Sequence, residues 1–117
     1  MKIVINKCFG GYLLSVKCVI KYYELKGIKV YHWRTMLGLS VYSSVPKLKY
    51  AEKYGLEEYD IERTDPVLIK VIETIGTSVA SGIYAELKII EIPDDVKYYI
   101  AEYNGVETIN EEHRSWS

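Results

Sequence analysis

The chain has 117 residues, of which 49% are hydrophobic and 26% are charged, and its formal net charge at pH 7 is -1. This length and composition predict one globular domain, residues 1–117, with a single core, and exclude a disordered or fibrous chain. The small net charge argues against a DNA-binding protein, because affinity for a phosphate backbone rests on many lysine and arginine contacts.

The first part of the chain contains a predicted strand, helix and strand. Residues 2–7 alternate apolar and polar side chains and are rich in β-branched residues, which is typical of a strand. Apolar residues then recur at helical spacing over 16–26, with Ser15 as the N-cap and Gly27 as the stop. Residues 28–34 alternate again. Because a helical crossover ordinarily joins parallel strands, we expect the two strands to be parallel neighbours.

The middle of the chain contains the clearest helix start. Residues 35–60 are rich in Tyr, Ser and Lys, and we expect only a short strand near 39–42 and a short helix around 49–54. Residues 64–66, Thr-Asp-Pro, place a capping side chain before a proline at the first helical position. The apolar face of the predicted helix consists of Leu68, Val71, Ile72, Ile75 and Val79. Gly76 interrupts this helix, which would allow the close approach of another backbone.

The last third of the chain predicts three strands. Residues 86–92 alternate apolar and polar side chains. Residues 97–103 and 106–109 flank Asn104-Gly105, the strongest short-range hairpin signal, because both central residues of that turn need a positive φ. All the elements together predict an α+β fold, in which a small mixed β-sheet packs with two main helices in a single domain that forms oligomers.

Charge is divided unequally between the two halves of the chain. Residues 1–53 hold ten Lys or Arg against two Glu, whereas residues 54–117 hold five Lys or Arg against fourteen Asp or Glu. Complementary halves of this kind either lie against each other within one molecule or guide protomers into a dimer or ring.

Two further features bear on location. No apolar run reaches the roughly 18–20 residues that a membrane span needs, and the N-terminus lacks the sections of a signal peptide. We therefore expect a cytoplasmic protein without membrane association. Cys8 and Cys18 would be reduced there and do not form a metal-binding pattern; Cys18 is expected to be a small buried hydrophobic residue.

The turn after the first strand is a first candidate for ligand binding. Gly10 and Gly11 would let backbone amides point towards an anion, as in phosphate-binding loops. The alternative is structural, because a tight strand-to-helix turn itself needs glycine. Cys8 has no His, Asp or Asn locally placed to activate it as a nucleophile.

Tyrosine and arginine supply further candidates. There are 12 Tyr and one Phe, and tyrosine suits interfaces and pockets for planar ligands. Of the 15 basic residues only Arg34, Arg63 and Arg114 are arginines. Their rigid fork matches phosphate or carboxylate, so these arginines either form ion pairs within the molecule or hold an anionic small molecule.

The end of the chain combines an imidazole, a guanidinium and an indole, in His113, Arg114 and Trp116. Such a segment either contributes to a binding site or is tied down onto its own domain. His32, beside Trp33 in a predicted strand, is expected to be packed rather than to act as a ligand. No paired carboxylates, Ser-His-Asp arrangement or H-E-x-x-H motif is present, so we expect no enzyme, no metal and no cofactor.

Three segments carry a resemblance to a known family. They are MKIVINKCFGGYLLS at the start, RTDPVLIKVIETIG in the centre and AELKIIEIPDDVKYYIAEYNGVETINEEHRSW at the end. In these segments the chain resembles small phage and prophage proteins of the first type of viral Thoeris anti-defence family. The resemblance implies a homo-oligomer, from a dimer up to a hexamer, in the host bacterial cytoplasm. It would enclose cyclic ADP-ribose isomers made by TIR enzymes without cleaving them, and would hold cyclic di- or trinucleotides in separate sites.

The resemblance also implies ligand-binding residues at the positions that match its motifs. These residues are Phe9, Gly10, Gly11, Tyr12, Arg63, His113, Arg114 and Trp116. Arg114 is expected to bind phosphate, Trp116 to stack or to form an interface, and His113 to act as an adjacent donor. Residues 35–59 match nothing in the family, and residues 15–17, Ser-Val-Lys, depart from its acidic first helical turn.

Two other functions remain open from the sequence. One is a protein-binding or structural phage component without a nucleotide ligand, in which the divided charge and the tyrosines meet another protein. The other is an enzyme acting on a nucleotide or phosphoester, which would need Cys8 or His113 for turnover.

Overall fold

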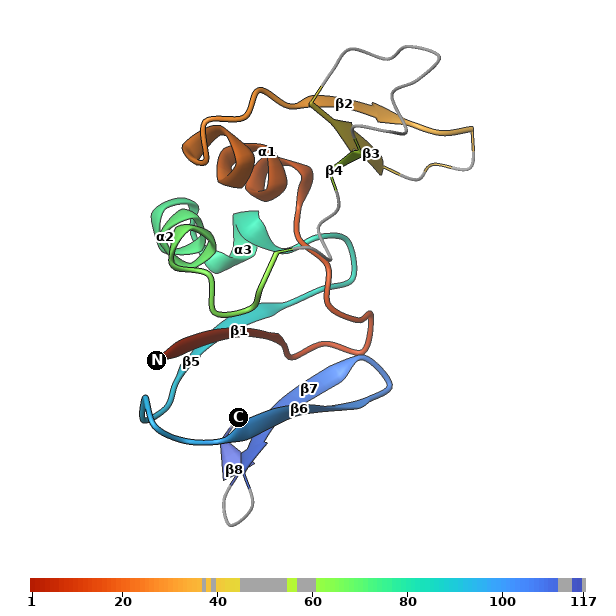
Figure 1. The fold of residues 1–117 in the computed structure, drawn as a ribbon. Coiled ribbons are helices and arrows are strands. Elements are labelled where there is room, and N and C mark those ends of the chain that lie inside the picture. The colour runs from red at the N-terminus through yellow and green to blue at the C-terminus, as the bar shows by residue number, and fades with distance from the viewer. Residues whose placement is uncertain (37, 39, 45–54, 57–60, 112–114, 117) are drawn as a thin grey trace.

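The computed structural model of the protein describes residues 1–36, 38, 40–44, 55–56, 61–111 and 115–116 (Figure 1). Its helices are α1 (Val16–Leu25), α2 (Pro66–Ile75) and α3 (Thr77–Ala80). Its strands are β1 (Lys2–Asn6), β2 (Tyr31–Arg34), β3 (Ser40–Ser43), β4 (Gly55–Leu56), β5 (Leu87–Glu91), β6 (Tyr98–Tyr103), β7 (Val106–Glu111) and β8 (Ser115–Trp116). The predicted short helix at 49–54 lies outside the described residues.

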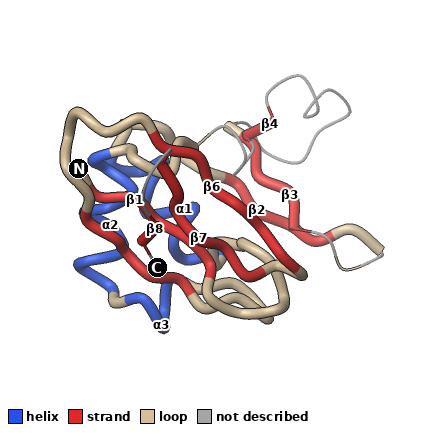
Figure 2. Tube along the Cα trace, turned by 90° about the horizontal axis from the view of Figure 1, so that it is seen from below, coloured by secondary structure: helices blue, strands red, loops and turns tan. Residues whose placement is uncertain are grey.

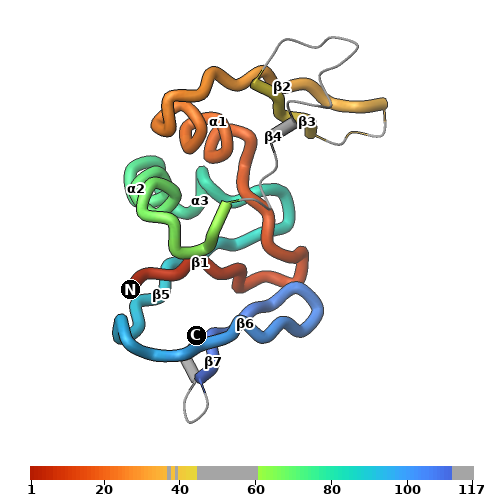
Figure 3. Tube along the Cα trace, in the orientation of Figure 1, coloured from red at the N-terminus to blue at the C-terminus, as the bar shows by residue number. Residues whose placement is uncertain are grey.

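The elements are arranged in layers. The three helices form one layer, β1 and β5 lie beneath them, and the sheet β6–β7–β8 lies on the far side of β1 (Figure 1). The sheet β2–β3–β4 lies beyond α1 (Figure 3). Seen from below, β6 and β7 stand in front of the helices (Figure 2). The predicted α+β class is confirmed, and no helix in the described ranges combines the length and hydropathy needed to cross a bilayer.

The pairing of the strands corrects the prediction. Every strand pair in the described chain is antiparallel, and the strands form three separate sheets, so the predicted single mixed sheet is wrong. The predicted parallel pairing of 2–7 with 28–34 is also wrong, because β1 pairs with β5 and β2 pairs with β3. Both edges of β1 are occupied: β5 takes one edge, and on the other the Val4 N–H donates to the Arg63 carbonyl at 3.0 Å.

Both predicted helix starts are confirmed by their caps. The Ser15 hydroxyl accepts a hydrogen bond from the Cys18 N–H at 3.1 Å at the start of α1. The Asp65 carboxylate accepts from the Val67 N–H at 2.8 Å, and Pro66 takes the first position of α2. These contacts satisfy amides that have no partner inside a helix, which is why short polar side chains precede both segments.

The end of α2 differs from the prediction. Gly76 adopts a φ of 88° and separates α2 from α3, so the predicted continuous apolar face up to Val79 is wrong. Val79 lies in α3 and is largely exposed. A Cβ on Gly76 would have no heavy atom within 4 Å, so the glycine serves the backbone angle and not a close approach of another backbone.

The predicted C-terminal hairpin is confirmed. Asn104 and Gly105 have φ values of 51° and 90°, the left-handed pair that a two-residue turn between β6 and β7 requires. β7 also pairs with β8, through Ile109 opposite Trp116 and Asn110 opposite Ser115. The backbone of the last described residues is therefore tied to the C-terminal sheet.

The core consists of two clusters on opposite faces of β1 and β5. Towards the helices, Val4 and Leu87 pack with the buried faces of α1 and α2. Towards the C-terminal sheet, the second cluster comprises Ile3, Ile5, Ile90, Ile92 and Ile109. β1 is thus covered on both faces, which explains why a strand that begins at an exposed Lys2 is fully buried from its second residue onwards.

Asp65 joins the two long helices. The Tyr22 hydroxyl of α1 donates to the Asp65 carboxylate at 2.6 Å, and the Lys26 ammonium lies 3.5 Å from it. Burial raises the pKa of the Asp65 carboxyl, but the hydrogen bonds from Tyr22 and from the Val67 N–H and the charge of Lys26 outweigh that effect, so its pKa lies below the ordinary value of 3.8. The stabilisation by the charged carboxylate is therefore complete above the unfolded-state pKa and is lost as the pH falls through the folded-state pKa.

Replacing Tyr22 by phenylalanine is expected to lower the free energy of unfolding by about 1–2 kcal/mol at pH 7, because the half-buried Asp65 carboxylate loses a hydrogen bond. The same bond lowers the pKa of Asp65, so the Tyr22→Phe variant should lose less stability on acidification than the wild type. Urea unfolding above and below pH 4 measures both effects, with the exposed Tyr99→Phe as the control for loss of a hydroxyl. An equal loss at both pH values would mean that the hydroxyl does not act on the Asp65 charge.

Candidate ligand-binding site

The glycine turn between β1 and α1 is held between two other segments. A Cβ on Gly10 would overlap the carbonyl oxygen and Cβ of Tyr84. A Cβ on Gly105, in the hairpin turn, would lie 2.5 Å from the Gly11 nitrogen and 2.6 Å from the Phe9 carbonyl oxygen. Glycine at 10 and at 105 is therefore needed for close contact between backbones, which supports the structural reading of this turn.

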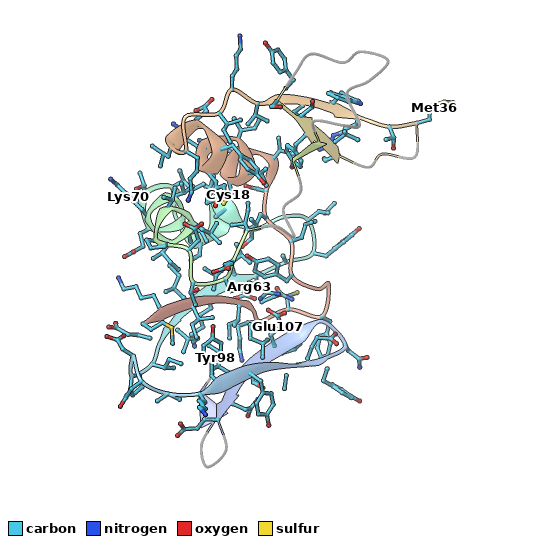
Figure 4. All side chains as sticks on the ribbon, viewed as in Figure 1. Cys18, Met36, Arg63, Lys70, Tyr98 and Glu107 are labelled. Atoms are coloured by element: carbon cyan, nitrogen blue, oxygen red, sulfur yellow. The ribbon has the colours of Figure 1, made fainter. Side chains whose placement is uncertain are left out.

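Arg63 lies next to the turn, near Glu107, and is the centre of the interactions there (Figure 4). Its two Nη atoms bind the Glu107 carboxylate in parallel, at 2.7 and 2.9 Å, and Nη1 also donates to the Val4 carbonyl at 3.2 Å. The guanidinium carbon lies 3.4 Å from the centre of the Tyr12 ring. Arg63 thus forms the intramolecular ion pair that was one of its two predicted roles, and it stacks on a second predicted site residue.

Asn6 and Glu107 are central to this cluster, and sequence reasoning missed both. The fully buried Asn6 amide donates to the carbonyls of Cys8 and Gly105, each at 2.6 Å, and its oxygen accepts from the Glu86 N–H at 2.8 Å. The Glu107 carboxylate also accepts from the Asn6 N–H at 2.8 Å. The alternation of side chains along a strand could have indicated Glu107. It lies two residues before the buried Ile109 and therefore faces the same side of the sheet.

Three exposed aromatic residues lie in or next to the glycine turn and the hairpin turn. Phe9, Tyr84 and Tyr103 are 74%, 75% and 76% exposed, although each contacts or neighbours the glycine turn or the hairpin turn. Tyr84 also has a φ of 64°, a backbone conformation that is costly for a bulky residue. Rings held in this way can stack against a planar molecule or pack against another protein.

The C-terminal motif reaches a different part of the hairpin. Trp116 lies opposite Ile109, which is four residues from Gly105 and therefore roughly 13 Å from it along an extended strand. His113 and Arg114 lie outside the described residues. The structure brings Phe9, Gly10, Gly11, Tyr12 and Arg63 together, and within one chain it places the backbone of Trp116 away from them.

Other candidate groups are less distinctive. The described ranges contain no group of three or more His, Cys, Asp or Glu side chains able to hold a metal ion. His32 packs on Tyr42, with ring centres 5.1 Å apart, and burial together with the charge of Arg34 lowers the pKa of the His32 imidazole. An open hollow of about 330 Å³ is lined by Thr77, Ser78, Ser81, Ala85, Glu86 and Leu87.

Several ion pairs join the basic and acidic halves of the chain. Lys2 contacts Glu73 at 3.1 Å, and Lys26 contacts Asp65 at 3.5 Å. These pairs favour the reading in which the two halves lie against each other within one molecule.

Comparison with known proteins adds no relative. No protein-family model matches the sequence, and neither curated proteins nor solved structures give a match.

Proposed function

We propose that the protein is a phage anti-defence protein that sequesters cyclic nucleotide immune signals, namely cyclic ADP-ribose isomers and in addition cyclic oligonucleotides, without cleaving them. It would act as a homo-oligomer in the host bacterial cytoplasm. The observation that carries the proposal is the meeting of the three resembling segments. Arg63 of the central segment stacks on Tyr12 of the first, and Gly105 of the last segment lies against the turn at Gly11.

The chemistry of such a ligand fits the residues around the turn. A cyclic nucleotide needs an aromatic face for its base and donors for its phosphates. Phe9 and Tyr84 offer exposed rings. Both Nη atoms of Arg63 bind Glu107, so its role in the proposal is to position Tyr12 and the turn, while Arg114 and His113 bind the phosphates.

A homo-oligomer would bring together two parts of the proposed site that lie apart in one chain. The glycine turn and the backbone of Trp116 lie towards opposite ends of the hairpin in one chain. In the proposed oligomer, the turn of one protomer and the C-terminal segment of another therefore form the pocket together. A sequestering protein needs tight binding and no chemistry, which agrees with a sequence that lacks a catalytic constellation.

Titration calorimetry of the purified protein with cyclic ADP-ribose isomers tests this function, followed by heat denaturation and chromatography of the released ligand. Tight binding and recovery of the intact ligand are expected. Arg114→Ala should weaken binding about tenfold to a hundredfold, because a charge-assisted contact with phosphate is lost. The matched control is Arg34→Ala, at an exposed arginine of β2, which should bind like the wild type. A cleaved product, or no heat with any isomer or cyclic oligonucleotide, would exclude the sequestering function.

A protein-binding phage component is the second candidate, and the exposed apolar side chains favour it. Phe9, Ile83, Tyr84 and Tyr103 are each more than 70% exposed in a small protein. Exposed patches of this kind mark interaction surfaces. This function would be favoured if the protein captured one host protein, if the Phe9→Ser variant no longer captured it, and if no nucleotide bound.

A further inference from the structure

β6 forms an open edge of the C-terminal sheet. The hairpin that joins β6 to β7 closes with the pair Tyr103 and Val106 around a two-residue turn. In such a hairpin the closing pair exchanges hydrogen bonds, and hydrogen-bonded pairs then alternate along the strands. The backbone groups of Tyr98, Ile100 and Glu102 therefore point away from β7.

These outward N–H and C=O groups have no hydrogen-bond partner within the described part of the chain. On two other strands, hydrogen bonds to other segments pair part of the outward backbone. The Val4 N–H of β1 donates to the Arg63 carbonyl at 3.0 Å, and the Leu87 N–H of β5 donates to the Ser81 hydroxyl at 2.9 Å. Of the outward residues of β5, Ile89 and Glu91 also lack a partner within the described residues, whereas on β6 all three outward residues lack one. Unpaired strand edges are templates for pairing with another strand.

We propose that a second copy of this chain pairs with it along β6, antiparallel and about a two-fold axis at Ile100. Ile100 then lies opposite the partner's Ile100, and Tyr98 lies opposite the partner's Glu102. The outward groups of both copies form about six hydrogen bonds between the chains. The two C-terminal sheets become one continuous sheet.

The side chains on the solvent face fit this register. Tyr99 lies opposite the partner's Ala101, so a large ring meets a small residue, and Lys97 lies opposite the partner's Tyr103, so a cation meets an aromatic face. Nowhere in the register do like charges meet. Tyr99 is 60% exposed and Tyr103 is 76% exposed, and both rings lose water contact in the dimer. Because the axis is two-fold, each of these contacts occurs twice, with the roles of the two protomers exchanged.

Sedimentation velocity without nucleotide, from about 1 to 200 μM, tests the interface, since one strand edge predicts a small contact area and a modest affinity. The wild type should pass from monomer to dimer. Tyr99→Lys with Ala101→Lys places lysine opposite lysine twice and should weaken the dimer about tenfold or more. Tyr99→Glu with Ala101→Lys makes the same two contacts attractive and should restore it. Circular dichroism confirms that each variant is folded.

A disulfide provides an independent measure of the register. Residues 99 and the partner's 101 form a non-hydrogen-bonded pair, whose Cα separation of about 4.5–5.5 Å suits a disulfide. Tyr99→Cys with Ala101→Cys, in a Cys8→Ser background, should give linked dimers on oxidation. A wild type that stays monomeric over the whole range, or a dimer that is indifferent to the lysine pair, would overturn the interface. Neither outcome depends on a nucleotide, so the result is separate from that of the calorimetry.

Discussion

Replacing Arg63 by methionine is expected to lower the free energy of unfolding by about 3 kcal/mol, because it leaves a buried carboxylate without its cation. The Glu107 side chain is 7% exposed and that of Arg63 is 27% exposed, so water replaces little of the lost interaction. The parallel hydrogen bonds at 2.7 and 2.9 Å and the bond to the Val4 carbonyl disappear together. Guanidinium unfolding followed by circular dichroism measures the change.

Two further variants separate burial from charge. Lys2→Met breaks the ion pair between Lys2 and Glu73, in which the two side chains are 43% and 49% exposed. It should lower the free energy of unfolding by less than about 1 kcal/mol. The double variant Arg63→Met with Glu107→Leu removes both charges and should be more stable than Arg63→Met alone. If Arg63→Met costs no more than Lys2→Met, the ion pair does not hold the hairpin to β1.

Gly10→Ala is expected to cost about 3 kcal/mol or more, because the new methyl group would overlap the backbone of Tyr84 and two backbone segments would have to separate. The neighbouring Gly11→Ala is the matched control. Gly11 has a φ of 89°, but a Cβ there would have no heavy atom within 4 Å, so its cost is the backbone strain of about 1–2 kcal/mol. Thermal unfolding of the two variants compares them directly, and equal losses would contradict the close contact between the turn and Tyr84.

The elements that the sequence predicted well are those with local signals. Ser15 and Asp65 cap the helices next to them, and the Asn104-Gly105 turn fixes its own hairpin, so each can be recognised within a few residues. The partners of the strands depend on distant residues instead. β1 cannot accept β2 because segments from much later in the chain, at Arg63 and β5, take its two edges.

The residues of the candidate site likewise divide into those that the sequence alone indicates and those that depend on distant segments. Its glycines and Arg63 were visible because glycine pairs and rare arginines are conspicuous in a sequence. Asn6 and Glu107 lie 101 residues apart and meet only in the fold, through the hydrogen bond between the Asn6 N–H and the Glu107 carboxylate. No local pattern pairs an asparagine in the first strand with a glutamate in the last hairpin.

The burial of β1 between late segments has a consequence during synthesis. Ile3, Val4 and Ile5 leave the ribosome well before the strands that cover them, β5 and β7, because those strands lie much later in the chain. Contacts that span most of a chain form slowly and only after the distant segment exists. Until those later segments are made and fold over it, the growing chain carries an uncovered, β-branched strand that is prone to pair with other chains.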